Sequence, residues 1–298
     1  MQPIFRFAPS PNGALHLGHA LSALINHEAA KRTGGRFLLR LEDIDTIRCT
    51  EDKIDQMLED LAWLGLQWEE PVIRQSDRFD HYTKALEELK QKGLIYPSVA
   101  SRKDIQTTIG GWREQTGTPW PEDPDGAPLF PRTLLNALEK DGQEAAWRLD
   151  MTKALATLSK PLFWQESGPL GSDTPGESTI AAVPEQWGDV VLGRKDCGTS
   201  YHLSVVIDDA AQGITHVVRG QDLFEATSVH RLLQTLLDLP APCYHHHRLL
   251  TSPDGDKLSK SRMDLSLRQL RQDGVTPNEV RRMIELSDAD LEAFMPEA

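Results

Sequence analysis

The sequence is poor in cysteine and has no long apolar run. Its three cysteines, Cys49, Cys197 and Cys243, lie far apart and form no C-x-x-C pair. This argues against a disulfide framework and a thiolate zinc site, and indicates a reducing, intracellular setting. No stretch reaches the roughly 18 apolar residues of a membrane span, and residues 1–19 lack the apolar region of a signal peptide. We therefore expect a cytoplasmic protein with no membrane segment.

Positive charge is also scarce. The chain has 32 Lys and Arg against 45 Asp and Glu, a formal net charge of -13, which argues against a surface made uniformly cationic for nucleic acid or anionic lipid. Residues 247–271 are an exception, with six Lys or Arg against three Asp, so we expect a small basic face there. The length of 298 residues suits two domains, or one large domain with an insertion.

The first forty residues predict a strand, a helix and a second strand. Residues 3–8 form a short apolar run that the turn formers of residues 9–13 must end. Apolar residues at helical spacing follow over 17–31, and residues 36–41 are typical of a buried strand. Such a unit is the start of a parallel sheet, so we predict an α/β fold with a Rossmann-like nucleotide-binding sheet.

Further elements are expected along the rest of the chain. Residues 51–64 and 77–92 have helical periodicity. Residues 201–207 (YHLSVVI) and 214–218 (ITHVV) are rich in β-branched residues and predict two strands, followed by a helix over 223–237. Two short helical patterns run to the end of the chain.

A change of composition predicts an inserted subdomain. Residues 97–184 hold ten of the 19 prolines, and five of the seven tryptophans lie in or just after this stretch. We therefore expect a split catalytic domain formed by 1–97 and 189–262, an inserted subdomain at 98–188, and a short helical C-terminal segment at 263–298.

The motif His16-Leu17-Gly18-His19 stands where the first strand and turn lead into the first helix. Free backbone N–H groups and the positive end of the helix dipole suit an anion, the imidazoles add donors, and Gly18 lets a flat base approach the backbone. ATP phosphates are the natural ligand. The alternative is that His16 and His19 only cap and pack the helix.

A second motif, Lys257-Leu258-Ser259-Lys260-Ser261, lies in a polar loop. The two flexible ammonium groups of Lys257 and Lys260 can stabilise the charge that develops on a leaving pyrophosphate. The alternative is a solvated basic loop, but the presence of the histidine motif upstream favours a catalytic role.

These motifs together resemble the two signature sequences of class I aminoacyl-tRNA synthetases. Longer strings resemble the glutamyl branch of that class: RFAPSPNG from Arg6, LEDIDTIR from Leu41, and SYHLSVVIDDAAQGITHVVRGQD from Ser200. The resemblance covers about residues 1–97 and 189–262. Only 37 residues follow Ser261, which is too short for the anticodon-binding region of a full glutamyl-tRNA synthetase. The chain is therefore similar to the shortened paralogues of that enzyme, which transfer glutamate to queuosine in tRNA(Asp).

The resemblance implies a glutamate pocket. Arg6 matches the family's arginine that binds the side-chain carboxylate of glutamate. A guanidinium group suits this role because it can bind a carboxylate through two hydrogen bonds. Glu42 matches the acid that holds the substrate ammonium, and Tyr201 and Arg219 match further pocket residues. Ala8 and Ser10 would shape the pocket with their neighbours Phe7 and Pro9. Other roles remain open: an ion pair of Arg6 with Glu42 or Asp43, a sheet aromatic for Tyr201 and a turn contact for Arg219.

The resemblance also implies the reaction and its partners. The α-carboxylate of L-glutamate attacks the α-phosphate of ATP, with Mg²⁺ as the phosphate counterion, and a queuosine hydroxyl of tRNA(Asp) then attacks the glutamyl-adenylate. Catalysis is mainly positioning and charge stabilisation, by His16 and His19 on one side and Lys257 and Lys260 on the other. Gly18 and Ser259 would complete the ATP site. We expect a monomer.

No metal site is expected. The family that the chain resembles commonly has zinc-binding cysteines just after the strand that ends here at Tyr96, but this chain has no cysteine between Cys49 and Cys197, so we predict that zinc is absent. Asp208-Asp209 is interpreted as a polar connection between strands, and the tract 245–247 (HHH), of which only His246 matches a usual family histidine, as local packing.

Two alternatives to the queuosine-directed enzyme stay open. The chain could be a catalytic module that charges a tRNA 3′ end. It could instead be an inactive nucleotide- or tRNA-binding paralogue, or another nucleotidyltransferase with the histidine motif.

Overall fold

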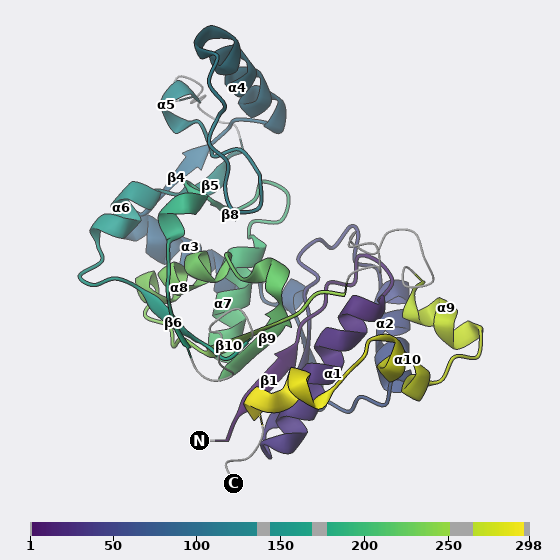
Figure 1. The fold of residues 1–298 in the computed structure, drawn as a ribbon. Helices are drawn as coiled ribbons and strands as arrows, with labels where there is room; N and C mark the ends of the chain where they lie inside the picture. The colour runs from purple at the N-terminus through teal and green to yellow at the C-terminus, as the bar shows by residue number, and fades with distance from the viewer. Residues whose placement is uncertain (1, 136–143, 169–177, 251–264, 295–298) are drawn as a thin grey trace.

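A computed structural model describes residues 2–135, 144–168, 178–250 and 265–294 (Figure 1). Seven strands form the main sheet: β1 (Ile4–Phe7), β2 (Arg36–Leu41), β3 (Glu69–Arg74), β6 (Phe163–Glu166), β7 (Ser178–Ala181), β9 (His216–Gly220) and β10 (Cys243–His247). Their order is β3-β2-β1-β9-β10-β6-β7, and every neighbouring pair is parallel except β6 with β7. A second, antiparallel sheet has the order β4-β5-β8, with β4 (Ile95–Ser98), β5 (Ala146–Leu149) and β8 (Val191–Gly193).

Helices connect and cover these strands. The α-helices are α1 (Leu17–Arg32), α2 (Glu51–Trp63), α3 (Phe79–Gln91), α4 (Arg102–Thr116), α5 (Arg132–Leu135), α6 (Met151–Ala156), α7 (Tyr201–Ala211), α8 (Thr227–Leu236), α9 (Leu267–Gln272) and α10 (Pro277–Met283). Short 3-10 helices are η1 (Gln75–Asp77), η3 (Pro184–Trp187), η4 (Gln221–Leu223) and η6 (Asp288–Phe294). In Figure 1, α4, α5 and the small sheet stand apart from the large sheet.

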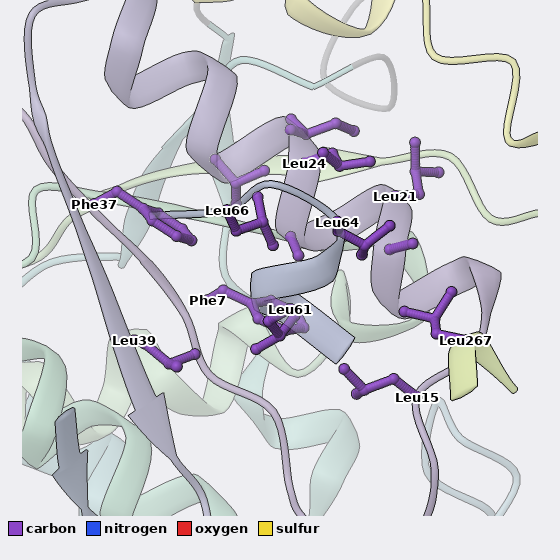
Figure 2. Packing of buried hydrophobic residues seen from close by; sticks show 14 of the residues in the cluster. Phe7, Leu15, Leu21, Leu24, Phe37, Leu39, Leu61, Leu64, Leu66 and Leu267 are labelled. Carbon is purple, nitrogen blue, oxygen red and sulfur yellow. The ribbon is translucent and has the colours of Figure 1, made fainter. Parts of the chain in front are cut away.

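The alternation of side chains along β1 and β2 separates two faces of the main sheet. Phe5 and Phe7 pack with Phe37, Leu39 and the helix α1 in one hydrophobic cluster, part of which is seen in Figure 2. The residues between them point the other way, since successive side chains of a strand alternate. Arg6 and Arg40 therefore face α7, where both contact Asp209.

The C-terminal elements return to the beginning of the chain. The backbone N–H of Leu267, at the start of α9, donates to the carbonyl of Leu15 at 2.7 Å. Phe294 packs edge-on against Phe5, with ring centroids 5.7 Å apart. Figure 1 shows α10 and η6, in yellow, beside α1. This segment thus supports the same cluster as β1 and α1.

Most of the predicted elements are confirmed, but one is wrong. Residues 201–207 form the first part of helix α7 and not a strand. Leu203, Val205 and Val206 are all buried, which makes this helix apolar on several sides. Such a helix cannot be distinguished from a buried strand by composition. The stabilisation from burial outweighs the β preference of valine. The helix expected over 223–237 is α8, preceded by η4.

The stretch 98–188 is not one separate layer. Its strands β6 and β7 extend the main sheet beyond β10, whereas β4 and β8 at its borders belong to the small sheet. The expected inserted subdomain therefore differs in extent from the structural unit formed around β4, β5 and β8, because sheet pairing joins segments that are distant in sequence.

Candidate active site

A cavity of about 320 Å³ lies at the carboxyl ends of β1, β9 and β10. The chain connects β1 to β2 on one side and places β9 on the other, and crevices at such reversals of strand order are where open α/β sheets bind ligands. The cavity is lined by Arg6, Phe7, Ala8, Pro9, Ser10, His16, Gly18, His19, Leu21, Ser22, Glu42, Tyr201, Val218, Arg219, Gly220, Asp222, Leu223, His247, Arg248, Leu249 and Leu250.

The first wall of the cavity is the N-terminus of α1. His16 is the N-cap: its Nδ1 accepts from the Gly18 N–H at 3.1 Å, and the Nδ1 of His19 accepts from the His16 N–H at 3.1 Å. In the neutral ring of His19 the other nitrogen then carries the proton, so its Nε2 is a donor. Burial, followed by the nearby His16, lowers the pKa of His19 to about 4. A Cβ at Gly18 would lie 2.9 Å from the His16 ring, which explains the glycine.

The second wall contains a cluster of buried charges. Asp209 accepts from Arg6 Nε at 3.0 Å and from Arg40 Nη1 at 2.8 Å. Arg40 Nη2 also donates to Glu42 Oε1 at 3.2 Å. Burial would raise the pKa of Asp209, but the guanidinium groups of Arg6 and Arg40 outweigh burial and lower it. For Glu42 burial prevails and raises the pKa despite Arg40 and Arg6.

Arg219 is buried and donates only to uncharged groups of the described residues. Its acceptors are His246 Nε2 (3.0 Å), Tyr201 Oη (3.4 Å), His230 Nδ1 (3.1 Å), the Leu223 carbonyl (3.1 Å) and Thr227 Oγ1 (2.7 Å). These acceptors use the five N–H groups of a guanidinium. The charge of Arg219 has no carboxylate partner within the described ranges, and a buried charge of this kind favours an anionic ligand.

The histidines around Arg219 must be neutral. The Nε2 of His246 accepts from Arg219, so its Nδ1 carries the proton and donates to Glu166 Oε2 at 2.6 Å. Burial lowers the pKa of His246 to about 4, although Glu166 acts in the opposite direction. Burial and then Arg219 lower the pKa of His230 well below its usual value. Neutral rings allow both histidines to accept from the arginine.

The structure brings the expected glutamate residues and the histidine motif into this one cavity. Tyr201 enters it from the first residue of α7 and not from a strand. Arg6 does form an ion pair, but with Asp209 and not with Glu42 or Asp43. Lys257, Ser259 and Lys260 lie outside the described residues.

The interpretation of Asp208 and Asp209 as a polar connection between strands is wrong. Both are buried on α7. Asp208 accepts from Arg78 Nε at 2.6 Å and from Tyr82 Oη at 2.7 Å. The tract 245–247 is the buried end of β10.

Sequence reasoning missed several residues of the site. Asp209, His247, Arg248 and Asp222 carried no expected role in it, and neither did Arg40, which holds Asp209 from β2. The alternation of β2 places Arg40 on the same face as Arg6, which was the only signal for it. Within the described residues no group of three or more His, Cys, Asp or Glu could hold a metal ion, and the absence of zinc stays a prediction.

The fold, the site and a family match together define the class of enzyme to which the chain belongs. The family described as "tRNA synthetases class I (E and Q), catalytic domain" matches residues 4–158 and 165–294. The chain belongs to this family and is a ligase of the class I aminoacyl-tRNA synthetase kind. In the parts of the chain that the structure describes, no helix has the length and apolar character needed to cross a membrane.

Individual relatives indicate which members of the family this chain resembles. A protein of Rhodobacter capsulatus named Glutamyl-Q tRNA(Asp) synthetase is 46% identical over 290 residues, which cover 95% of this chain and 100% of that protein. Glutamate–tRNA ligase 2 of Methylobacterium sp. is 37% identical over 96% of this chain, but only 60% of that protein is covered. The crystal structure of glutamate-tRNA synthetase from Elizabethkingia anophelis matches with a TM-score of 0.69 and 26% identity, over 92% of this chain and 54% of that one. The resemblance inferred from the motifs is thereby confirmed.

Proposed function

We propose that this chain uses ATP to convert L-glutamate into glutamyl-adenylate and then transfers the glutamyl group to queuosine in tRNA(Asp). The observation that carries the proposal is the single cavity that holds both the arginine cluster and the N-terminus of α1. Similarity to the full length of a protein named Glutamyl-Q tRNA(Asp) synthetase supports the choice of acceptor.

The charges at the glutamate end match the substrate. Arg6 and Arg40 pair with Asp209 and Glu42, whereas Arg219 has only uncharged acceptors among the described residues. These three arginines and two acids therefore leave one positive charge when both acids are ionised. Glutamate at neutral pH has two carboxylates and one ammonium group, and therefore one negative charge. Opposite charges in a partly enclosed cavity attract more strongly than in water.

Three groups would hold the amino acid. Arg6 uses Nε and one Nη2 hydrogen on Asp209, and Nη1 donates to the Val218 carbonyl at 3.5 Å. The second hydrogens of Nη1 and Nη2 would bind the side-chain carboxylate. The hydroxyl of Tyr201 accepts from Arg219 and can donate to the same carboxylate. Glu42 would receive the ammonium group, and this cation would lower the pKa that burial has raised.

The second end of the cavity would hold ATP. The imidazoles of His16 and His19 and the positive end of the α1 dipole would attract the phosphate oxygens. Mg²⁺ would enter as the counterion of the phosphates. Lys257 and Lys260 keep their proposed role on the pyrophosphate. No protein nucleophile is needed, because the substrate carboxylate itself attacks the α-phosphate and pyrophosphate leaves.

Amino-acid-dependent exchange of pyrophosphate into ATP tests the activation step. We expect exchange with glutamate, and much weaker exchange with glutamine or aspartate, measured with and without tRNA. Glutamine would place a neutral amide against the Arg6 edge and leave its charge unpaired. Equal exchange with glutamate and glutamine would contradict the assignment of Arg6 and Arg219.

A second candidate is glutamylation of a tRNA 3′ end. Relatives named Glutamate–tRNA ligase 2 are 37% identical to this chain, and both candidates share the adenylate step. The site of attachment on the tRNA separates them. We place the reaction in the cytoplasm and expect a monomer to carry it out.

A further inference from the structure

One wall of the cavity is held by the C-terminal segment. The wall consists of residues 247–250, at and after the end of β10. Arg248 Nε donates to Asp290 Oδ1 at 2.9 Å. Its Nη2 donates to the carbonyls of Ile284 at 2.7 Å and Glu285 at 3.1 Å, which lie at the C-terminal end of α10, where a cation is favourable.

Asp290 is itself fixed. Its side chain is 8% exposed, and its Oδ2 accepts from the backbone N–H and the hydroxyl of Ser287 at 3.0 and 3.1 Å. Leu291 and Phe294, in the same helix η6, are buried in the hydrophobic cluster of α1. Arg248 is therefore bound to a buried carboxylate in a segment that packs on the hydrophobic cluster of α1.

The neighbours of Arg248 in the wall are also fixed by contacts. The carbonyl of Arg248 accepts from His247 Nδ1–H at 2.8 Å, which fixes the orientation of that ring. Leu250 packs against the cluster that contains Leu15 and Leu17, the residues on either side of His16. The wall thus lies beside the N-terminus of α1, whereas the glutamate end is held by Asp209 and Arg40.

We propose that Asp290 is a positioning residue for the nucleotide: through Arg248 it holds the wall 247–250 beside the N-terminus of α1 and so sets the affinity for ATP. This inference rests on the proposed function of the cavity. It predicts an effect on ATP binding and not on glutamate binding, because Asp290 and Arg248 bond to each other, to Ser287 and to the end of α10, and not to Arg6, Glu42 or Asp209.

The test compares Asp290→Asn with a matched control. Asp288 lies in the same helix and pairs with Arg32 at 2.6 Å, but its side chain is 85% exposed. If the wall is correctly held in about one tenth of Asp290→Asn molecules, the KM for ATP in pyrophosphate exchange should rise about tenfold. The KM for glutamate and kcat should change less than about twofold. Asp288→Asn should leave all three unchanged, and Asp290→Glu should restore part of the ATP affinity.

Several results would overturn the inference. An unchanged KM for ATP in Asp290→Asn would remove Asp290 from nucleotide binding. An equal rise of both KM values, with a lower melting temperature, would show a general structural role. If the wild-type protein shows no exchange, the proposed function fails; equilibrium dialysis with ATP then still compares the variants, and equal dissociation constants would reject the positioning role by itself.

Discussion

Asp209→Asn is expected to reduce both stability and glutamate affinity. In the wild-type protein one carboxylate compensates two buried guanidinium groups, with N···O distances of 3.0 Å to Arg6 and 2.8 Å to Arg40. The side chains of Arg6 and Arg40 are 5% and 0% exposed, so water cannot replace the lost charge. Removal of one partner from a buried ion pair costs about 3–5 kcal/mol.

That loss is a large part of the stability of a typical domain, about 5–15 kcal/mol. At about 2–4 °C per kcal/mol for a chain of this size class, the melting temperature should fall by roughly 10 °C. Arg6 would also lose the carboxylate that sets its orientation. The KM for glutamate should therefore rise at least about tenfold, which corresponds to about 1.4 kcal/mol, while the KM for ATP changes little.

Asp208→Asn provides the control for stability. Asp208 is the neighbouring residue on α7, its side chain is 0% exposed, and it compensates Arg78 at 2.6 Å. This variant should lose comparable stability, because it also leaves a guanidinium without its carboxylate partner. It should keep the wild-type KM for glutamate, because Asp208 binds Arg78, Tyr82 and Gln75 and not the cavity residue Arg6.

Thermal unfolding and pyrophosphate exchange of both variants distinguish a role of Asp209 in glutamate binding from a role in stability alone. The exchange is measured well below the melting temperature of each variant, so that only folded protein is compared. If Asp209→Asn keeps the wild-type KM for glutamate, Asp209 and Arg6 are a purely structural pair. If both variants raise that KM equally, the effect comes from lost stability and not from the site.

Three further results are expected. Arg219→Lys has three N–H groups for five acceptors, so the KM for glutamate in pyrophosphate exchange should rise about tenfold or more; an unchanged KM would place Arg219 outside the site. His246 has a pKa of about 4 in the folded chain and about 6.5 when unfolded, so the unfolded chain binds more protons between these values. The free energy of unfolding should fall as the pH falls from 6.5 to 4, by up to about 1.4 kcal/mol per pH unit for each such histidine; urea titrations with a flat pH profile would contradict this. Elemental analysis of the purified protein should find substoichiometric zinc, and one zinc per chain would contradict the prediction from the missing cysteines.

The beginning of the fold could be predicted because its signals are local. The turn formers of residues 9–13 end β1, and the apolar spacing from Leu17 defines α1. The HLGH motif could be placed at a helix N-terminus for the same reason, and its position in the cavity follows from the parallel strand order.

The rest depends on contacts between distant segments. No local signal could show that β6 and β7 join the main sheet. β7 pairs with β6, but β6 joins the sheet through β10, which lies about eighty residues further along the chain. The pairing of Asp209 with Arg6 and Arg40 depends on α7 being a helix, and its buried apolar surface gave it the composition of a strand. The bond of Arg248 to Asp290 joins residues that are 42 positions apart.

The most direct measurement of the central claim is the position of the label on tRNA. The protein is incubated with ATP, labelled glutamate and tRNA(Asp), with and without queuosine, and the tRNA is then cleaved and mapped. We predict that the label appears at the queuosine nucleotide of the anticodon and is absent when the tRNA lacks queuosine. Label at the 3′ end, independent of queuosine, would contradict the proposed function.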